Sequence, residues 1–119
     1  MLEPTQRLNV SQAGSATVVE LIDRKILDEV AILEIGEQLT TLVSQADVPR
    51  LILDFGSVRH LSSSALGMLI TLHKRIREKS GLLRLCNIQS AINEIFEITR
   101  LSEVFEIVES REAALAGLE

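Results

Sequence analysis

The sequence predicts an α/β domain in which helices pack against a small mixed β-sheet. Three observations support this fold class. Short runs of β-branched and other apolar residues alternate along the chain with longer segments of helical periodicity. The length of 119 residues suits one hydrophobic core, so residues 1–119 are expected to form a single domain. The composition, 46% hydrophobic and 24% charged, is typical of a globular protein.

The first part of the chain predicts a hairpin followed by a helix. A β-branched run at residues 17–22 follows the turn-forming segment 12–15, which would connect it to a short strand at residues 7–11. Residues 28–44 have a strand-like start, but their apolar residues recur at helical spacing. We therefore expect a helix there.

The middle of the chain predicts a central strand and the longest helix. Pro49 breaks the chain, and residues 50–55 form an apolar run that contains Asp54. A loop at residues 56–61 leads to three serines, which precede a strongly periodic segment that stops at Gly81. The buried stripe of this helix is expected at Ala65, Leu69, Leu72 and Ile76, widened by Leu66 and Ile70.

The last third of the chain continues the alternation of strand and helix. We expect strands at residues 82–86 and 104–108, and helices at residues 90–99 and 110–118. The inward residues of the two helices are expected to be Ile92, Ile95, Phe96 and Thr99, and Ala113, Leu115 and Leu118.

Composition argues against several classes of protein. The net charge of −5 opposes nucleic-acid binding, and only three aromatic residues are available for stacking on bases or sugars. No apolar run is long enough to span a bilayer and no signal peptide is evident, so a cytoplasmic protein is expected. Cys86 is the single cysteine and is expected to be a buried hydrophobe, while His60 and His73 lack neighbours at ligand spacing. We expect neither a metal nor a cofactor.

Residues 51–70, LILDFGSVRHLSSSALGMLI, resemble the signature of STAS domains. In that family a strand ending in Asp is followed by a short loop, a serine pair and a Leu-Gly helix start. The resemblance continues through GLLRLC at residues 81–86 and EAAL at residues 112–115, so it covers nearly the whole chain. It implies a STAS-type sandwich, with Asp23 just after the second strand and residues 31–44 in the first helix.

The STAS members that this chain resembles are bacterial anti-sigma factor antagonists. In them the first serine of an Asp-Ser-Ser or Asp-Ser-Thr element is phosphorylated by the anti-sigma factor, which is itself a kinase. By position that serine is Ser63. Ser62 stands where those members usually have the acid, and Ala65 replaces a glycine, so Ser62 is a second candidate acceptor. The resemblance implies that the unphosphorylated form binds the kinase and frees a sigma factor.

The spacing of the serine region is compatible with such a switch. On a helix, Ser63, Gly67 and Lys74 share one side, away from the apolar stripe. A phosphate at the start of a helix is held by unpaired N–H groups and the positive end of the helix dipole. We expect a monomer or weak dimer whose partner is an anti-sigma factor serine kinase. The residues expected to contact that partner are Asp23, Asp54, Ser62, Ser63, Ser64, Gly67 and Lys74.

Other interpretations remain open. The serines could be a helix N-cap and nothing more, and for Asp54 a structural role is favoured. Asp54, His60 and Ser63 supply the residue types of a hydrolase triad but without a nucleophile elbow. A phosphoacceptor receiver domain would need an acidic pair after its first strand and a late lysine, and no lysine follows Lys79. A STAS sensor or assembly module that binds a protein, nucleotide or lipid without phosphorylation is the alternative within the binding class.

Overall fold

A five-stranded mixed sheet forms the centre of the fold in the computed structural model, which describes residues 7–118. The strand order is β1-β2-β4-β6-β7, and every neighbouring pair is parallel except the antiparallel β1–β2 hairpin at one edge. The strands are β1 (Leu8–Ala13), β2 (Ala16–Leu21), β4 (Arg50–Asp54), β6 (Leu82–Cys86) and β7 (Glu106–Val108). The expected mixed α/β architecture is confirmed.

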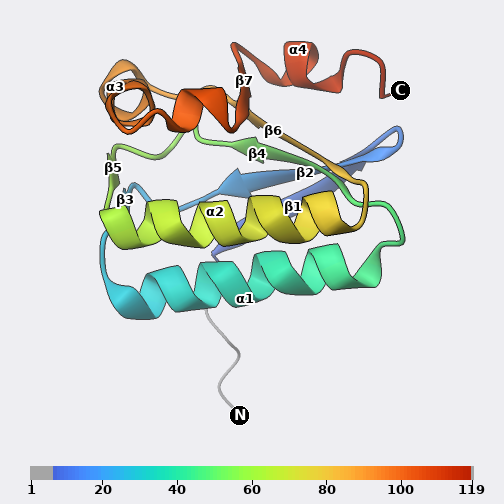
Figure 1. The fold of residues 1–119 in the computed structure, drawn as a ribbon, viewed down its shortest axis with the longest axis horizontal. Coiled ribbons are helices and arrows are strands. Elements are labelled where there is room, and N and C mark those ends of the chain that lie inside the picture. The colour runs from blue at the N-terminus through green and yellow to red at the C-terminus, as the bar shows by residue number, and fades with distance from the viewer. Residues whose placement is uncertain (1–6, 119) are drawn as a thin grey trace.

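The helices lie unequally on the two faces of this sheet. Two long parallel helices lie side by side and cover one face, and a short C-terminal helix packs on the other (Figure 1). The helices are α1 (Glu29–Gln45), α2 (Ser63–Glu78), α3 (Ser90–Ile98), the 3-10 turn η1 (Leu101–Glu103) and α4 (Arg111–Leu115).

The alternation of side chains along each strand separates the core into two clusters. In β4, Leu51 and Leu53 face α1 and α2, whereas Ile52 faces the other side and packs in a smaller cluster with Ala114 of α4. The buried stripe expected in the serine-led helix is confirmed, since Ala65, Leu66, Leu69, Leu72 and Ile76 are all buried.

Several boundaries differ from the expectation. The first helix begins at Glu29, two residues before the start that the family resemblance implied, because the Asp28 carboxylate accepts a hydrogen bond from the N–H of Ala31 and caps the helix there. The expected strand at residues 104–108 begins only at Glu106, because η1 extends the preceding turn and leaves Val104 exposed.

Two expected inward residues are exposed. Thr99 follows the end of α3, and its hydroxyl donates back to the carbonyl of Ile95 instead of entering the core. Ala113 is exposed and Ala114 is buried, because α4 begins at Arg111 and spans only five residues, which sets the face it presents to the sheet.

A second, two-stranded sheet was missed. The expected loop at residues 56–61 contains β5 (His60–Leu61), which pairs in parallel with β3 (Lys25–Ile26). Strands of two residues carry no periodicity, so only the tertiary pairing defines them. The ribbon lies at the end of the molecule where α1 and α2 begin (Figure 1).

The C-terminal end of α2 also differs from the expected glycine cap. Ser80, not Gly81, adopts the left-handed conformation that ends the helix, with φ of 56°. Gly81 is required by space, because a Cβ there would lie 2.3 Å from the carbonyl oxygen of Pro49. Among residues 7–118, no helix has the length and apolar character needed to cross a membrane.

Candidate functional site

The serine triplet lies at the start of α2, and its first member is a helix cap. Ser62 has an extended backbone, and its Oγ accepts a hydrogen bond of 3.2 Å from the N–H of Ala65. Its own N–H donates to the carbonyl of Ile26 in β3, at 3.1 Å. Ser62 is half-buried, and both its side chain and its backbone form hydrogen bonds that hold the start of α2.

The next two serines are in the first turn of α2 and are exposed. Ser63 is the first helical residue, where backbone N–H groups have no intrahelical partner and the helix dipole is positive. Ser63 is thus an accessible hydroxyl in a position that suits a negative charge.

Gly67 and Lys74 continue the exposed side of α2 on which Ser63 lies. A Cβ added at Gly67 would meet no atom within 4 Å, so packing within the chain does not require glycine there. Glycine inside a helix costs roughly 1 kcal/mol relative to alanine. Lys74 is exposed one turn before the helix ends. The three residues form an open strip, called here the α2 strip.

Asp23 lies near the same end of the molecule but is held in an ion pair. Its Oδ2 is 2.8 Å from Nη1 of Arg7, and Nε of Arg7 lies 3.2 Å from Glu34 of α1. The side chain of Asp23 is 21% exposed. Arg7 thereby links Asp23, which follows β2, to α1.

Asp54 occupies a different place from the other expected contact residues. It is 5% exposed and lies on the α4 face of the sheet, where its carboxylate accepts hydrogen bonds from the N–H of Gly56, from Asn87 and from Arg111. Burial alone would raise the pKa of Asp54, but these donors outweigh burial and lower it. The structural role favoured for Asp54 agrees with this geometry, and its burial removes it from a surface that a partner could reach.

The three residues considered for a hydrolase triad do not form one. In the described part of the chain, no hydrogen bond connects Asp54, His60 and Ser63, and His60 is exposed on β5. Within residues 7–118, no group of three His, Cys, Asp or Glu side chains has a metal-binding arrangement.

Three basic residues near the serines were not expected to form part of the site, because the β3–β5 ribbon was not expected. Arg24, Lys25 and Arg59 are exposed on or beside the ribbon, as is His60, and the β5 strand leads directly into Ser62. The N–H groups of Arg59 and His60 both donate to the carbonyl of Arg24. The ribbon thus places three permanent positive charges at the end of the molecule where α2 begins.

A family model supports the interpretation of the fold and of its signature. The model described as the STAS domain matches residues 7–114, which is most of the chain. The chain belongs to the STAS domain family.

Known STAS proteins give further comparisons. The chain is 35% identical over 85 residues to BtrV of Bordetella bronchiseptica, which is provisionally named an anti-sigma factor antagonist. The match covers 69% of this chain and 73% of BtrV. An anti-sigma factor antagonist STAS protein from Planctomyces limnophilus has a similar structure, with a TM-score of 0.79, 23% identity, and coverage of 92% of this chain and 96% of the other.

The antagonist SpoIIAA from Bacillus has a similar fold in two forms. Its phosphorylated form matches with a TM-score of 0.68, 20% identity, and coverage of 89% of this chain and 95% of SpoIIAA. The unphosphorylated form matches with a TM-score of 0.75, 19% identity, and coverage of 92% and 94%. The expected resemblance to the anti-sigma factor antagonist branch of the STAS family is confirmed.

Proposed function

We propose that this STAS protein is a cytoplasmic anti-sigma factor antagonist that binds an anti-sigma factor serine kinase through the α2 strip. Phosphorylation of Ser63 by that kinase ends the complex and returns the kinase to its sigma factor. The protein acts by binding and not by catalysis. The main support for this proposal is a difference between two neighbouring serines. Ser62 caps α2, whereas Ser63 is exposed on the first turn of the helix.

The geometry favours Ser63 over Ser62 as the phosphate acceptor. A kinase must place the acceptor oxygen in line with the γ-phosphate of ATP. The Oγ of Ser62 is held against the N–H of Ala65, and Ser62 is half-buried. Ser63 can present its hydroxyl without breaking a cap. SpoIIAA, a protein of similar fold, is known in a phosphorylated form.

A phosphate on Ser63 would change the surface and leave the fold intact. A dianion in the first turn of α2 is favoured by the helix dipole and the free N–H groups, so it does not unfold the helix. The same dianion in a docked interface costs desolvation and adds repulsion with any negative charge of the partner. A loss of about 3 kcal/mol in binding lowers affinity about 100-fold.

The β3–β5 ribbon supports an encounter with an ATP-loaded kinase. Although the chain carries a net charge of −5, the exposed cations Arg24, Lys25 and Arg59 lie at the end where Ser63 is presented. Exposed cations attract the phosphates of bound ATP and increase the association rate, more strongly at low salt.

The direct test is a phosphorylation assay with the cognate kinase and ATP, followed by mass spectrometry of the modified peptide. We expect one phosphate on Ser63 in the wild type, none in Ser63→Ala, and normal labelling in the matched control Ser64→Ala. Phosphate on Ser62 would move the switch by one residue. A complete absence of phosphate on all three serines would contradict the switch.

Binding measurements test the docking surface separately from the phosphate. Ser63→Asp is expected to weaken kinase binding, whereas Ser63→Ala is expected to bind as the wild type does and to resist release by ATP. Gly67→Arg, on the open part of the α2 strip, should also weaken binding without lowering the melting temperature, because arginine forms a helix more readily than glycine. Equal affinity of Gly67→Arg and wild type would place the docking surface elsewhere.

A further inference from the structure

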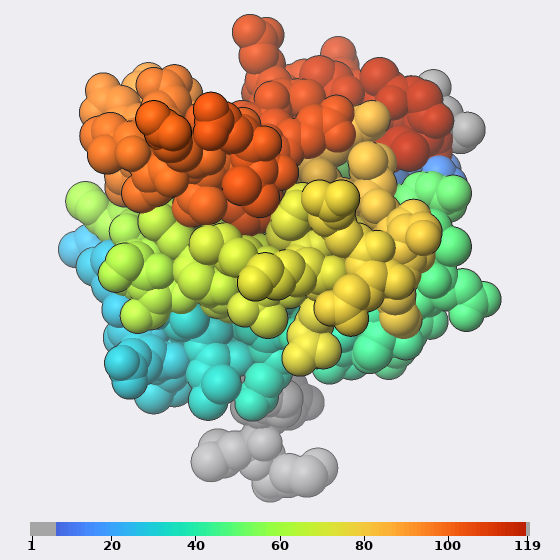
Figure 2. All heavy atoms as spheres, in the orientation of Figure 1, coloured from blue at the N-terminus to red at the C-terminus, as the bar shows by residue number. Residues whose placement is uncertain are grey.

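A groove between α1 and α2 lies beside the α2 strip. It has a volume of about 620 Å³ and runs along the face on which the two helices lie side by side (Figure 2). Its lining is mainly apolar and includes Leu33, Gly36 and Glu37 of α1, and Met68, Thr71 and Arg75 of α2. Leu33 is 62% exposed, and Val30 one turn before it is 63% exposed. Such exposed aliphatic side chains beside a groove are typical of a contact surface.

The two helices that form the groove carry opposite charges. From Glu29 to Gln45, α1 contains three glutamates and no lysine or arginine. The second half of α2 contains Lys74, Arg75 and Arg77 and ends at Glu78. In the described part of the chain, no ion pair joins α1 to α2, because Glu34 is paired with Arg7 and the remaining pairs lie elsewhere. Glu37 and Arg75 therefore line opposite walls of the groove with their charges available to another molecule.

We propose that this groove is a self-association surface whose occupant is a second copy of the chain. Because α1 and α2 are parallel, a twofold axis that runs along the helices places α1 of one copy over α2 of the other and preserves the direction of each helix (Figure 1). Glu37 of each copy then faces the wall that carries Arg75 in the other. Leu33 of each copy enters the groove near Met68 of its partner.

Charge selects this arrangement over the other twofold packing of the same face. A twofold axis across the helices would place α1 on α1 and α2 on α2. The acidic helices of the two copies would then face each other, and so would the basic helices. Like charges facing each other across an interface are strongly unfavourable. The same two glutamate–arginine contacts would make association sensitive to salt.

The experiment is sedimentation velocity of the full chain across a wide concentration range, at low and high salt. The wild type is expected to show a reversible monomer–dimer equilibrium that weakens as salt is added. Glu37→Arg and Arg75→Glu are each expected to lose dimer affinity by about tenfold or more, because each variant opposes two pairs of like charges. An equimolar mixture of the two variants should dimerise, and so should the double variant Glu37→Arg/Arg75→Glu.

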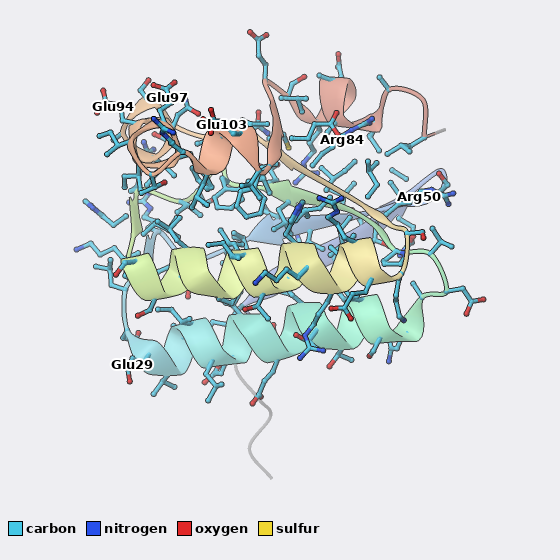
Figure 3. The ribbon with its side chains drawn as sticks, in the orientation of Figure 1. Glu29, Arg50, Arg84, Glu94, Glu97 and Glu103 are labelled. Carbon is cyan, nitrogen blue, oxygen red and sulfur yellow. The ribbon has the colours of Figure 1, made fainter. Side chains whose placement is uncertain are left out.

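The control is a charge reversal of similar size away from the groove. Glu97 lies on α3, at the opposite side of the molecule from α1 (Figure 3), and Glu97→Lys should dimerise as the wild type does. Circular dichroism checks that each variant is folded. Any of three results would overturn the proposal: a wild type that is monomeric at the highest concentration, a mixture of the two variants that does not associate, or a Glu97→Lys variant that weakens dimerisation as much as Glu37→Arg.

Discussion

Among the single residues of the described range 7–118, Asp54 is the one charged residue that is buried. Its carboxylate is almost fully buried and is satisfied by one backbone N–H and two side chains from other parts of the chain. Arg111 is the charged partner, and its side chain is 42% exposed, so water screens part of this ion pair. The interaction joins the end of the central strand to the first residue of α4.

We predict that Asp54→Asn lowers the free energy of unfolding by about 1–3 kcal/mol at neutral pH, because it leaves buried donors poorly matched. The folded-state pKa of Asp54 lies below its ordinary value. Its ionisation therefore stabilises the fold above the unfolded-state pKa, and this stabilisation is lost as the pH falls through the folded-state pKa. Chemical denaturation from neutral to acid pH should show the difference between wild type and Asp54→Asn shrinking below about pH 4.

A matched control for this change is Glu20→Gln. Glu20 lies 3.9 Å from the same arginine but is one-third exposed, so its loss should cost less than about 1 kcal/mol. A difference between Asp54→Asn and wild type that stays constant down to the lowest pH would assign the stabilisation to packing and not to the charge.

At the scale of elements, the C-terminus of α1 is capped by a residue from another helix. The last turn of α1 contains no basic residue. The Nζ of Lys79, which follows the end of α2, donates to the carbonyl oxygens of Val43, Ser44 and Ala46 at 2.9, 3.1 and 2.8 Å. All three carbonyls lie at the C-terminal end of α1, where intrahelical donors run out, and the Val43 carbonyl also accepts a hydrogen bond from the N–H of Ala46. The positive charge of Lys79 thus serves the neighbouring helix α1.

We predict that Lys79→Met destabilises the protein by about 1–2 kcal/mol, because it removes both the hydrogen bonds and the favourable charge at the end of α1. Hydrogen exchange should accelerate in the last turn of α1. Lys74→Met, which removes the same charge from an exposed site on α2, is the control and should leave stability and exchange nearly unchanged. Similar losses from both variants would indicate a general charge effect and contradict the capping role.

At the scale of the whole molecule, the two faces of the sheet are protected unequally. Two long helices cover the larger cluster, while the five-residue α4 covers Val18, Ile52 and Cys86. Arg84 holds α4 in place, since its Nη1 donates to the carbonyls of Ala114 and Ala116 (Figure 3). Burial raises the pKa of the Cys86 thiol to about 11, so Cys86 is both inaccessible and protonated at neutral pH.

We predict that Ala114→Glu releases α4 from the sheet and exposes Cys86 while the larger cluster stays folded. The reaction of the thiol with a disulfide reagent should be slow in the wild type and at least ~10-fold faster in Ala114→Glu, because the thiolate is the reactive species and access controls the rate. Ala113→Glu adds the same side chain to the exposed neighbour and should react like the wild type. Equal reactivity of the two variants would show that α4 does not control access to Cys86.

The pattern of apolar residues was sufficient to predict the long elements and their faces. In α2, five buried residues recur at helical spacing, and the serines before them predicted the cap that Ser62 makes. The apolar pattern does not predict the ribbon of β3 and β5. Its four residues carry no periodic signal, and they pair only after residues 25–26 and 60–61 are brought together by the fold. The burial of Asp54 likewise could not be predicted, because it depends on α4 packing against the side of β4 on which Asp54 lies.

By itself, the sequence determined the α/β fold, the family and the segment that carries the candidate serines, because periodicity and motif spacing are local properties of the chain. Only the tertiary structure decided which serine is a cap and which is exposed, that Asp54 is an internal group, and that Lys79 caps α1. These features arise from contacts between residues distant in the chain, such as Ser62 with Ile26 and Asp54 with Arg111. A side chain's exposure and partners depend on all the elements packed around it, and no short stretch of sequence encodes them.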